Sequence, residues 1–201
     1  MIKKKKIFTI GFLFLVLVTC FILYSPGFLL YSSECKKTDV IILLLGPDFK
    51  ARQKEANKLI NDGMADYLII PAYHKTYRIY DKATVKYLSS NLYLPRSDKK
   101  NVTSSPGFYE DTHLEIIEAK KMMSDYGLTS AIFVSSPYHM RRIKIIAMKV
   151  FDANKSDFYF VPTRYEKAPA NCWELSLADW KKVRREYGKI LWFFLYVPWS
   201  K

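Results

Sequence analysis

One short stretch contains most of the side chains that could do chemistry. In Val134-Ser135-Ser136-Pro137-Tyr138-His139-Met140-Arg141-Arg142, two serine hydroxyls, a tyrosine, an imidazole and guanidinium groups follow the apolar run Ala131–Val134. This junction predicts a buried strand followed by a helix, with Ser136 as the N-cap and Pro137 as the first helical residue. The backbone amides of a first helical turn lack intrahelical partners, so Ser135, Ser136 and these amides could bind an anion.

His139 and Arg142 are expected on the same flank of this helix, because they lie three residues apart. The positive end of the helix dipole disfavours a protonated imidazole, so we expect a neutral His139 that acts as a hydrogen-bond partner or acid–base catalyst. Arg142 would neutralise the charge of a bound phosphate or carboxylate. In the alternative without a ligand, Ser136 only caps the helix and Arg142 pairs with a protein carboxylate.

A second polar cluster, Glu110-Asp111-Thr112-His113-Leu114-Glu115, precedes another amphipathic run. Thr112 and Glu115 match a capping box, which would explain both residues without any ligand. Glu110 and Asp111 are candidates for a general base or for hydrogen bonds to a ligand, with Thr112 beside them across the pocket. Their alternative role is to stabilise the start of the helix by their charge.

The apolar runs alternate with amphipathic ones in the order expected for an α/β fold with a mainly parallel sheet. Strands are predicted at 39–46, 67–70, 131–135 and 158–161, and helices at 51–63, 112–126 and 138–150. A short helix is also predicted at 83–92. Ligands of such folds bind at the carboxyl ends of the strands, which would place Asp48 and Arg52, just after the first strand, near the mouth of the pocket.

Other site chemistries lack their sequence signatures. His74, His113 and His139 do not have metal-ligand spacing, and Ser135 is not in a G-x-S-x-G elbow. Gly46-Pro47-Asp48 lacks the glycines of a dinucleotide or P-loop fingerprint. The sequence therefore assigns neither a metal nor a cofactor.

The N-terminus predicts a membrane anchor. Lys3–Lys6 form a basic segment within residues 1–6, and residues 7–33 carry no charge, long enough to span a bilayer. We expect a single transmembrane helix at 7–31, a linker at 32–38 and an α/β domain at 39–201. The positive-inside rule places the lysines in the cytoplasm and the domain outside. A cleaved signal peptide and lipidation at Cys20 are the alternatives.

The net charge of +13 falls to +9 once the four lysines of residues 3–6 are set aside. The basic residues are not interleaved with aromatic residues in a stripe, so they indicate a solvated surface near anionic lipid rather than a nucleic-acid partner. Cys35 and Cys172 could pair, but their spacing does not require it. The helical pattern Leu177–Val197 would either pack on the domain or the anchor, or lie in the membrane interface with Trp192, Tyr196 and Trp199 at headgroup level.

Parts of the sequence resemble the YdcF-like family, which includes SanA-type vancomycin-exclusion and ElyC-type envelope-biogenesis proteins. The similar parts are Asp39–Gly46 with Arg52, Ala56, Leu59 and Gly63, then Thr112, and then Val134–Arg142, which is similar to the family's Tyr-His-Met-x-Arg motif. The resemblance covers residues 39–162. It implies a Rossmann-like three-layer sandwich and, for membrane-bound members, roles in envelope barrier function and in lipid-carrier or peptidoglycan metabolism.

Three departures from the family pattern fall on loops expected to face the ligand. Pro71-Ala72-Tyr73 replaces a Ser-Gly-Gly, Pro47 replaces the second glycine after the first strand, and Leu114-Glu115 replaces a Glu-Asn. The family's ligand therefore cannot be transferred to this chain.

The sequence thus predicts a membrane-anchored, extracytoplasmic protein that binds an anionic, phosphate-containing envelope metabolite, as a transferase, a hydrolase or a binding protein. A non-catalytic envelope scaffold or regulator and an S-adenosylmethionine-binding enzyme are the alternatives, and the oligomeric state stays open. The candidate catalytic residues are His139, Glu110 and Asp111. The candidate binding residues are Ser135, Ser136, Tyr138, Arg142, Thr112, Asp48 and Arg52.

Overall fold

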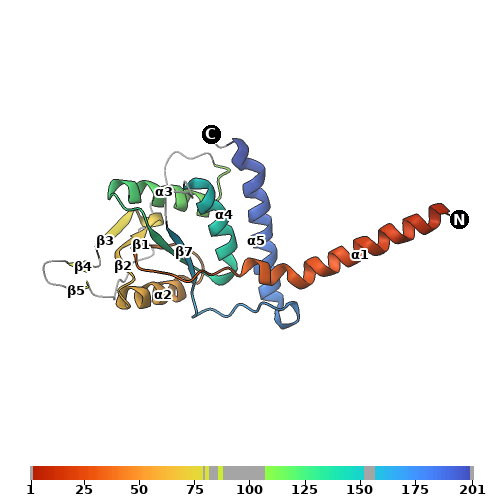
Figure 1. The fold of residues 1–201 in the computed structure, drawn as a ribbon, viewed down its shortest axis with the longest axis horizontal. Coiled ribbons are helices and arrows are strands. Elements are labelled where there is room, and N and C mark those ends of the chain that lie inside the picture. Colours follow the sequence, from red (N-terminus) through yellow and green to blue (C-terminus); the bar gives the residue numbers. More distant parts are fainter. Residues whose placement is uncertain (1, 79, 82–85, 88–106, 152–156, 200–201) are drawn as a thin grey trace.

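A five-stranded sheet with helices on both faces forms the centre of the molecule (Figure 1). The computed structural model describes residues 2–78, 80–81, 86–87, 107–151 and 157–199. The strands are β1 (Thr38–Leu43), β2 (Ala65–Ile70), β3 (Lys75–Arg78), β6 (Ala131–Ser135) and β7 (Phe158–Pro162), with a separate pair, β4 (Tyr80–Asp81) and β5 (Lys86–Tyr87). The α-helices are α1 (Ile2–Leu29), α2 (Phe49–Asn61), α3 (Asp111–Asp125), α4 (Met140–Val150) and α5 (Leu177–Tyr196).

The sheet has the order β3-β2-β1-β6-β7 and is mainly parallel, as predicted. β1 lies between β2 and β6, with Ile41 opposite Leu68 on one side and Ile132 on the other. β7 extends the parallel sheet beyond β6, whereas β3 is an antiparallel edge strand paired with β2. The sequence did not reveal β3, because Lys-Thr-Tyr-Arg lacks the apolar run that marks a buried strand. Most of the helix predicted at 83–92 lies outside the described residues, and Lys86–Tyr87 within it is a strand.

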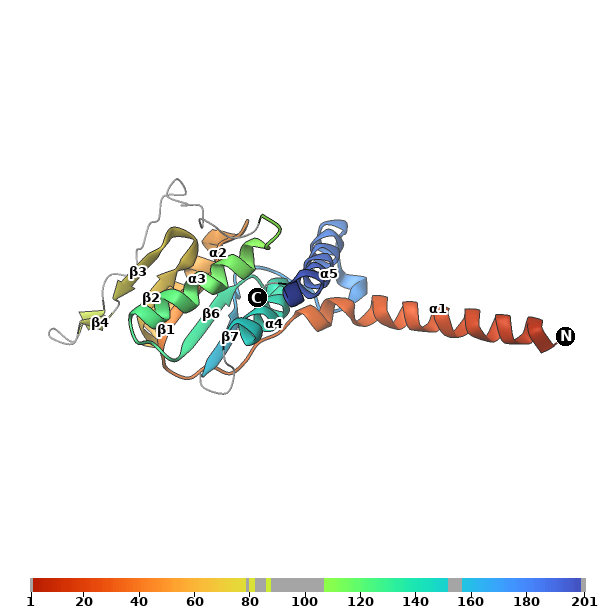
Figure 2. The ribbon, with the colours of Figure 1, turned by 90° about the horizontal axis from the view of Figure 1, so that it is seen from above.

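Side chains of the central strand alternate between two apolar layers. Val40 and Ile42 pack with α3 and α4, whereas Ile41 and Leu43 pack against α2. Both faces of the sheet are therefore covered, which is why the strand sequences are continuously apolar rather than alternating. The result is the predicted three-layer sandwich, seen from above in Figure 2.

The N-terminal helix α1 projects from the domain (Figure 1). Its side chains are exposed from Thr9 to Tyr24 and become buried at Ser25, and Leu29 is fully buried among residues of α5. Within the described residues, Thr9–Leu29 is long and apolar enough to cross a membrane by length and composition. The last turns of α1 are thus part of the domain's packing, although the sequence had suggested a separate anchor and linker.

Candidate functional site

A cavity of about 170 Å³ opens at the carboxyl ends of β1 and β6. The crossover from β1 leads to β2, while β6 lies on the other side of β1, so these two strand ends form the switch point where α/β folds bind ligands. The cavity is lined by Leu44, Leu45, Gly46, Pro47, Arg52, Asp111, Thr112, Glu115, Ser135, His139, Arg142, Ile143 and Lys189. Its size suits one small polar group rather than a whole drug-sized molecule, which needs about 300 Å³ or more.

Arg52 is a buried cation held by the loop after β1. Its Nη1 donates to the carbonyl oxygens of Leu44, at 3.0 Å, and Leu45, and its Nε donates to the Ser136 hydroxyl at 3.0 Å. Burial lowers the pKa of Arg52, and the negative charge of Glu115 opposes this change. Because an arginine stays protonated in proteins, this side chain presents a fixed positive charge to the cavity.

Gly46 makes room for this arginine. A Cβ atom built at Gly46 would lie 2.6 Å from Cζ of Arg52, closer than van der Waals contact allows. The glycine is therefore required by the position of the guanidinium, since no larger residue leaves space for it.

Arg142 connects three elements at the back of the cavity. It is 2 % exposed, and its Nε donates to Glu186 Oε2 at 2.7 Å. Its Nη1 donates to Thr112 Oγ1 at 2.7 Å and to Glu110 Oε1. Burial alone would lower the pKa of Arg142, but the charges of Glu186 and Glu110 raise it. The predicted alternative in which Arg142 pairs with protein carboxylates is thus realised, while its side chain still lines the cavity.

His139 is oriented by a carboxylate that the sequence did not reveal. Its Nδ1 lies 2.7 Å from Glu186 Oε1 and 3.2 Å from Arg142 Nη2. A carboxylate can only accept a hydrogen bond at this distance, so we assign the imidazole proton to Nδ1, which leaves Nε2 as an acceptor. Burial lowers the pKa of His139, and its hydrogen bond to Glu186 opposes that effect only in part. The neutral His139 expected from the sequence follows from burial rather than from a helix dipole.

Glu186 is almost fully buried between His139 and Arg142. Burial alone would raise its pKa, but the hydrogen bonds from His139 and Arg142 and the positive charge of Arg142 lower it to about 2. Glu186 is therefore ionised at neutral pH and fixes the ring of His139. It belongs to α5, where the sequence showed only a basic and apolar helix and gave no signal of a site.

The start of the helix after β6 differs from the prediction. Ser136 and Pro137 occupy the predicted N-cap and first positions, but Pro137–His139 form a 3₁₀ turn and the α-helix α4 begins only at Met140. The Ser136 side chain makes no capping hydrogen bond. It accepts from Arg52 instead, while Ser135 lines the cavity.

The predicted capping box at α3 is wrong. The N-cap residue is Glu110, without a capping hydrogen bond from its side chain, and the helix begins at Asp111. Thr112 instead accepts from Arg142, and Glu115 Oε2 accepts from the backbone N–H of Leu45 at 3.2 Å. Both side chains line the cavity, so these polar residues connect α3 to the site rather than cap it.

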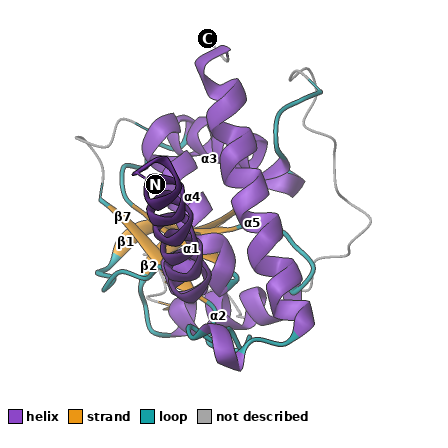
Figure 3. Ribbon diagram, turned by 90° about the vertical axis from the view of Figure 1, so that its right-hand side faces the viewer, coloured by secondary structure: helices purple, strands orange, loops and turns teal. Residues whose placement is uncertain are grey.

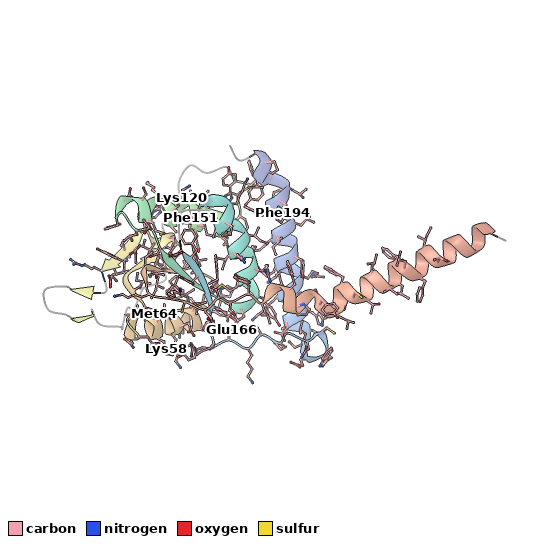
Figure 4. The ribbon with its side chains drawn as sticks, in the orientation of Figure 1. Lys58, Met64, Lys120, Phe151, Glu166 and Phe194 are labelled. Atoms are coloured by element: carbon pink, nitrogen blue, oxygen red, sulfur yellow. The ribbon has the colours of Figure 1, made fainter. Side chains whose placement is uncertain are left out.

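The cavity lining does not include four of the candidate residues: Glu110, Ser136, Tyr138 and Asp48. Tyr138 is buried, and its hydroxyl donates to the carbonyl oxygen of Pro169 at 2.7 Å. Asp48 lies 3.8 Å from Lys182, which also forms an ion pair with Glu166, at 2.8 Å. Glu166 is labelled in Figure 4. Burial alone would raise the pKa of Glu166, but its hydrogen bonds with Lys182 and Ser136 have the larger effect, so the pKa is lower than that of an ordinary glutamate. These residues hold the loop after β7 against the site.

Lys189 of α5 lines the cavity and is, after Glu186, a second site residue that the sequence did not reveal. Its side chain is 44 % exposed, and its Nζ lies 3.3 Å from Glu110 Oε1. With Arg52 and Arg142 it supplies three cations to the lining, whereas Asp111 and Glu115 supply two carboxylates. The cavity can therefore contact both an acidic group and the hydroxyls of a polar ligand.

No family model matches the sequence, and neither curated proteins nor solved structures show a match. Among the described residues, no group of three or more His, Cys, Asp or Glu side chains is arranged to hold a metal ion. Cys35 and Cys172 are both free thiols.

Proposed function

We propose that the protein is a membrane-anchored, extracytoplasmic α/β protein that binds a phosphate- or carboxylate-bearing envelope metabolite at the switch point of its sheet. The observation that carries this proposal is the convergence of three cations and the oriented imidazole of His139 on one small cavity. Two carboxylates in the same lining favour a ligand that also carries hydroxyls, such as a phosphorylated saccharide. The resemblance to the YdcF-like family supports the same role in the cell envelope.

His139 acts as the proton acceptor of this site. Its Nδ1 proton is held by Glu186, so Nε2 can take a proton from a ligand hydroxyl or a water molecule. Glu186 stabilises the imidazolium that results, as the carboxylate of a catalytic triad does. Because burial lowers the pKa of His139, the imidazole stays free to accept at neutral pH, and acidification through that lowered pKa removes the base.

The packing of α1 supports retention of the anchor rather than cleavage of a signal peptide. The Tyr187 hydroxyl donates to the Ser25 carbonyl oxygen at 3.0 Å, and Arg141 Nε donates to that of Phe28 at 2.8 Å. The rings of Phe21 and Tyr187 are also in contact. Removal of α1 would take away Leu29 and expose the residues that pack against it, Tyr138, Val183 and Ile190.

The S-adenosylmethionine alternative receives no support from the cavity, since about 170 Å³ cannot enclose a molecule of that size. The scaffold alternative is favoured by one observation, the pairing of Arg142 with two carboxylates, which satisfies its charge without a ligand. A binding experiment separates the scaffold from the ligand-binding protein.

Lys189→Gln is the most informative variant, because Lys189 is half-exposed at the cavity and its loss should leave the fold intact. With full-length protein in detergent, calorimetric titration of glycerol 3-phosphate should show binding. Lys189→Gln should weaken this binding about fivefold, or about 1 kcal/mol. Lys121→Gln, on the exposed side of α3, is the matched control and should bind like the wild type. Equal affinities for all three proteins, or no binding to any, would refute an anion site here.

A further inference from the structure

A second and larger cavity lies between α1 and α5. Its volume is about 670 Å³, and its apolar lining comes from Phe21 of α1 and from Leu177, Trp180, Val183 and Tyr187 of α5. The cavity is separate from the site at the sheet edge and shares none of its lining residues. Its volume is enough to enclose a substantial part of a drug-sized apolar molecule.

The position of α1 places this groove at a membrane surface, an argument that rests on the proposed anchoring. Residues 7–24 carry no charge, and eighteen helical residues at 1.5 Å each extend about 27 Å, close to the thickness of a hydrocarbon core. The side chain of Ser25, the next residue, is buried in the domain. Ser25 also lines the groove, so the groove lies at the boundary between the hydrocarbon core and the lipid headgroups.

Two cations complete the lining of the groove. Lys181 and Arg184 lie one turn apart on α5, both are exposed, and neither forms an ion pair with any residue in the described part of the chain. Their long apolar stems can lie along the groove while their charged ends reach the headgroup level. An apolar groove with two such cations at a membrane surface is complementary to a lipid with a negatively charged phosphate.

The C-terminal half of α5 also carries exposed apolar side chains. Leu191, Phe194 and Leu195 are each more than half exposed, and Phe194 lies toward the end of α5 away from α1 (Figure 4). Figure 3 shows α5 on the side of the domain from which α1 emerges. An amphipathic helix with basic and apolar exposed residues in this position is typical of an interfacial helix.

We propose that this groove binds an anionic phospholipid of the leaflet that α1 leaves. One acyl chain lies against Phe21, Leu177 and Trp180, and the phosphate contacts Lys181 and Arg184. The lipid fixes the angle between α1 and α5 and so holds the domain at a set distance from the membrane.

The test uses full-length protein in nanodiscs of phosphatidylcholine mixed with phosphatidylglycerol. The protein is released into mild detergent, and native mass spectrometry measures which lipid remains bound. The wild type should retain phosphatidylglycerol in preference to phosphatidylcholine. The double variant Lys181→Gln/Arg184→Gln should lose most of this preference, whereas the matched control Lys121→Gln/Lys149→Gln, with the same charge change on exposed positions of α3 and α4, should keep it.

Leu177→Asn adds a second readout, because it makes the groove polar without a change in charge and should reduce the retention of both lipids. Absence of a preference in the wild type, or equal loss in both double variants, would overturn the lipid site. Flotation of the same protein with liposomes tests the anchor separately. Flotation without lipid preference would reject the groove alone, and failure to float would reject the anchoring on which it rests.

Discussion

At the scale of single residues, the site depends on charges that are buried and compensated. Arg142 is surrounded by Glu186, Glu110 and Thr112, and Glu186 in turn fixes His139. Removal of one partner from a buried ion pair leaves an uncompensated charge and typically costs 3–5 kcal/mol. Arg142→Ala is therefore a poor probe of ligand binding, because it would destabilise the fold, and a loss of binding could then follow from unfolding alone.

Glu186 should make the stability of the protein depend on acid pH. Its pKa is about 2 in the folded protein and 4.5 when unfolded, so its stabilising effect is complete above pH 4.5 and is lost as the pH falls toward 2. The shift corresponds to about 3 kcal/mol. In thermal unfolding, Glu186→Gln should melt roughly 6–12 °C below the wild type at pH 7, a difference that narrows toward pH 2. Asp125→Asn, exposed at the end of α3, is the control. A pH-independent difference would contradict this assignment.

Gly46→Ala should destabilise the protein through Arg52. The new Cβ would displace the guanidinium from the carbonyl oxygens of Leu44 and Leu45, and unpaired buried acceptors cost about 1–3 kcal/mol. Gly107→Ala serves as the control, since its Cβ would meet no atom within 4 Å. Chemical denaturation of the two variants measures the difference. Equal stability would show that Arg52 can move without loss.

At the scale of elements, the strands were predictable and the partners of the polar residues were not. Continuous apolar runs identified four of the five strands of the sheet, and the end of β6 identified His139 and Arg142. Local patterns assigned Ser136 and Thr112 to caps, but tertiary contacts with Arg52 and Arg142 use those hydroxyls instead. A capping pattern concerns only neighbours in sequence, so it could not show an arginine that arrives from another element.

Helix α5 shows the same limit more strongly. Its exposed face is basic and apolar, which the sequence indicated, but its inner face brings Glu186 and Lys189 to the site. Tyr196, which the sequence had suggested for the membrane interface, is buried, and its hydroxyl oxygen lies 3.1 Å from Nδ1 of His113. The side chain of Trp199 lies outside the described part of the structure. The helix packs on the domain and on α1, as one alternative predicted, and its outer face is exposed, so its position in the membrane interface stays a prediction.

The 3₁₀ turn at Pro137–His139 is held in place by Tyr138. Tyr138→Phe removes the hydrogen bond to the Pro169 carbonyl oxygen and should cost about 1 kcal/mol of stability. It should leave glycerol 3-phosphate affinity unchanged, because Tyr138 does not line the cavity. Tyr126→Phe, at an exposed position, should change neither property. A large loss of affinity in Tyr138→Phe would instead assign this tyrosine to the ligand, as the sequence suggested.

At the scale of the whole molecule, α5 links the two cavities. One side of this helix faces the groove beside α1, and the other supplies Glu186 and Lys189 to the site at the sheet edge. The position of α5 therefore also determines the position of the carboxylate that orients His139. This arrangement suits a protein whose ligand is found close to the bilayer.

The orientation of the chain can be measured through Cys172, a free and partly exposed thiol. In a chain with Cys20→Ala and Cys35→Ala, a membrane-impermeant maleimide should label Cys172 in intact cells, because the proposed orientation places the domain outside the cytoplasm. A separate Lys5→Cys chain without the native cysteines should be labelled only after lysis. The opposite pattern would place the domain in the cytoplasm and reject the proposed envelope role.

The most direct test of the central claim is nitrogen NMR of the protein labelled at its three histidines, with His139→Gln for assignment. His139 should be less than half protonated at pH 6.5, where an ordinary histidine is half protonated, and its neutral form should carry the proton on Nδ1. Addition of inorganic phosphate, matched in ionic strength by sodium chloride, should shift its Nε2 resonance and leave that of buried His113 unchanged. A His139 that titrates like a surface histidine and does not respond to phosphate would contradict the proposed site.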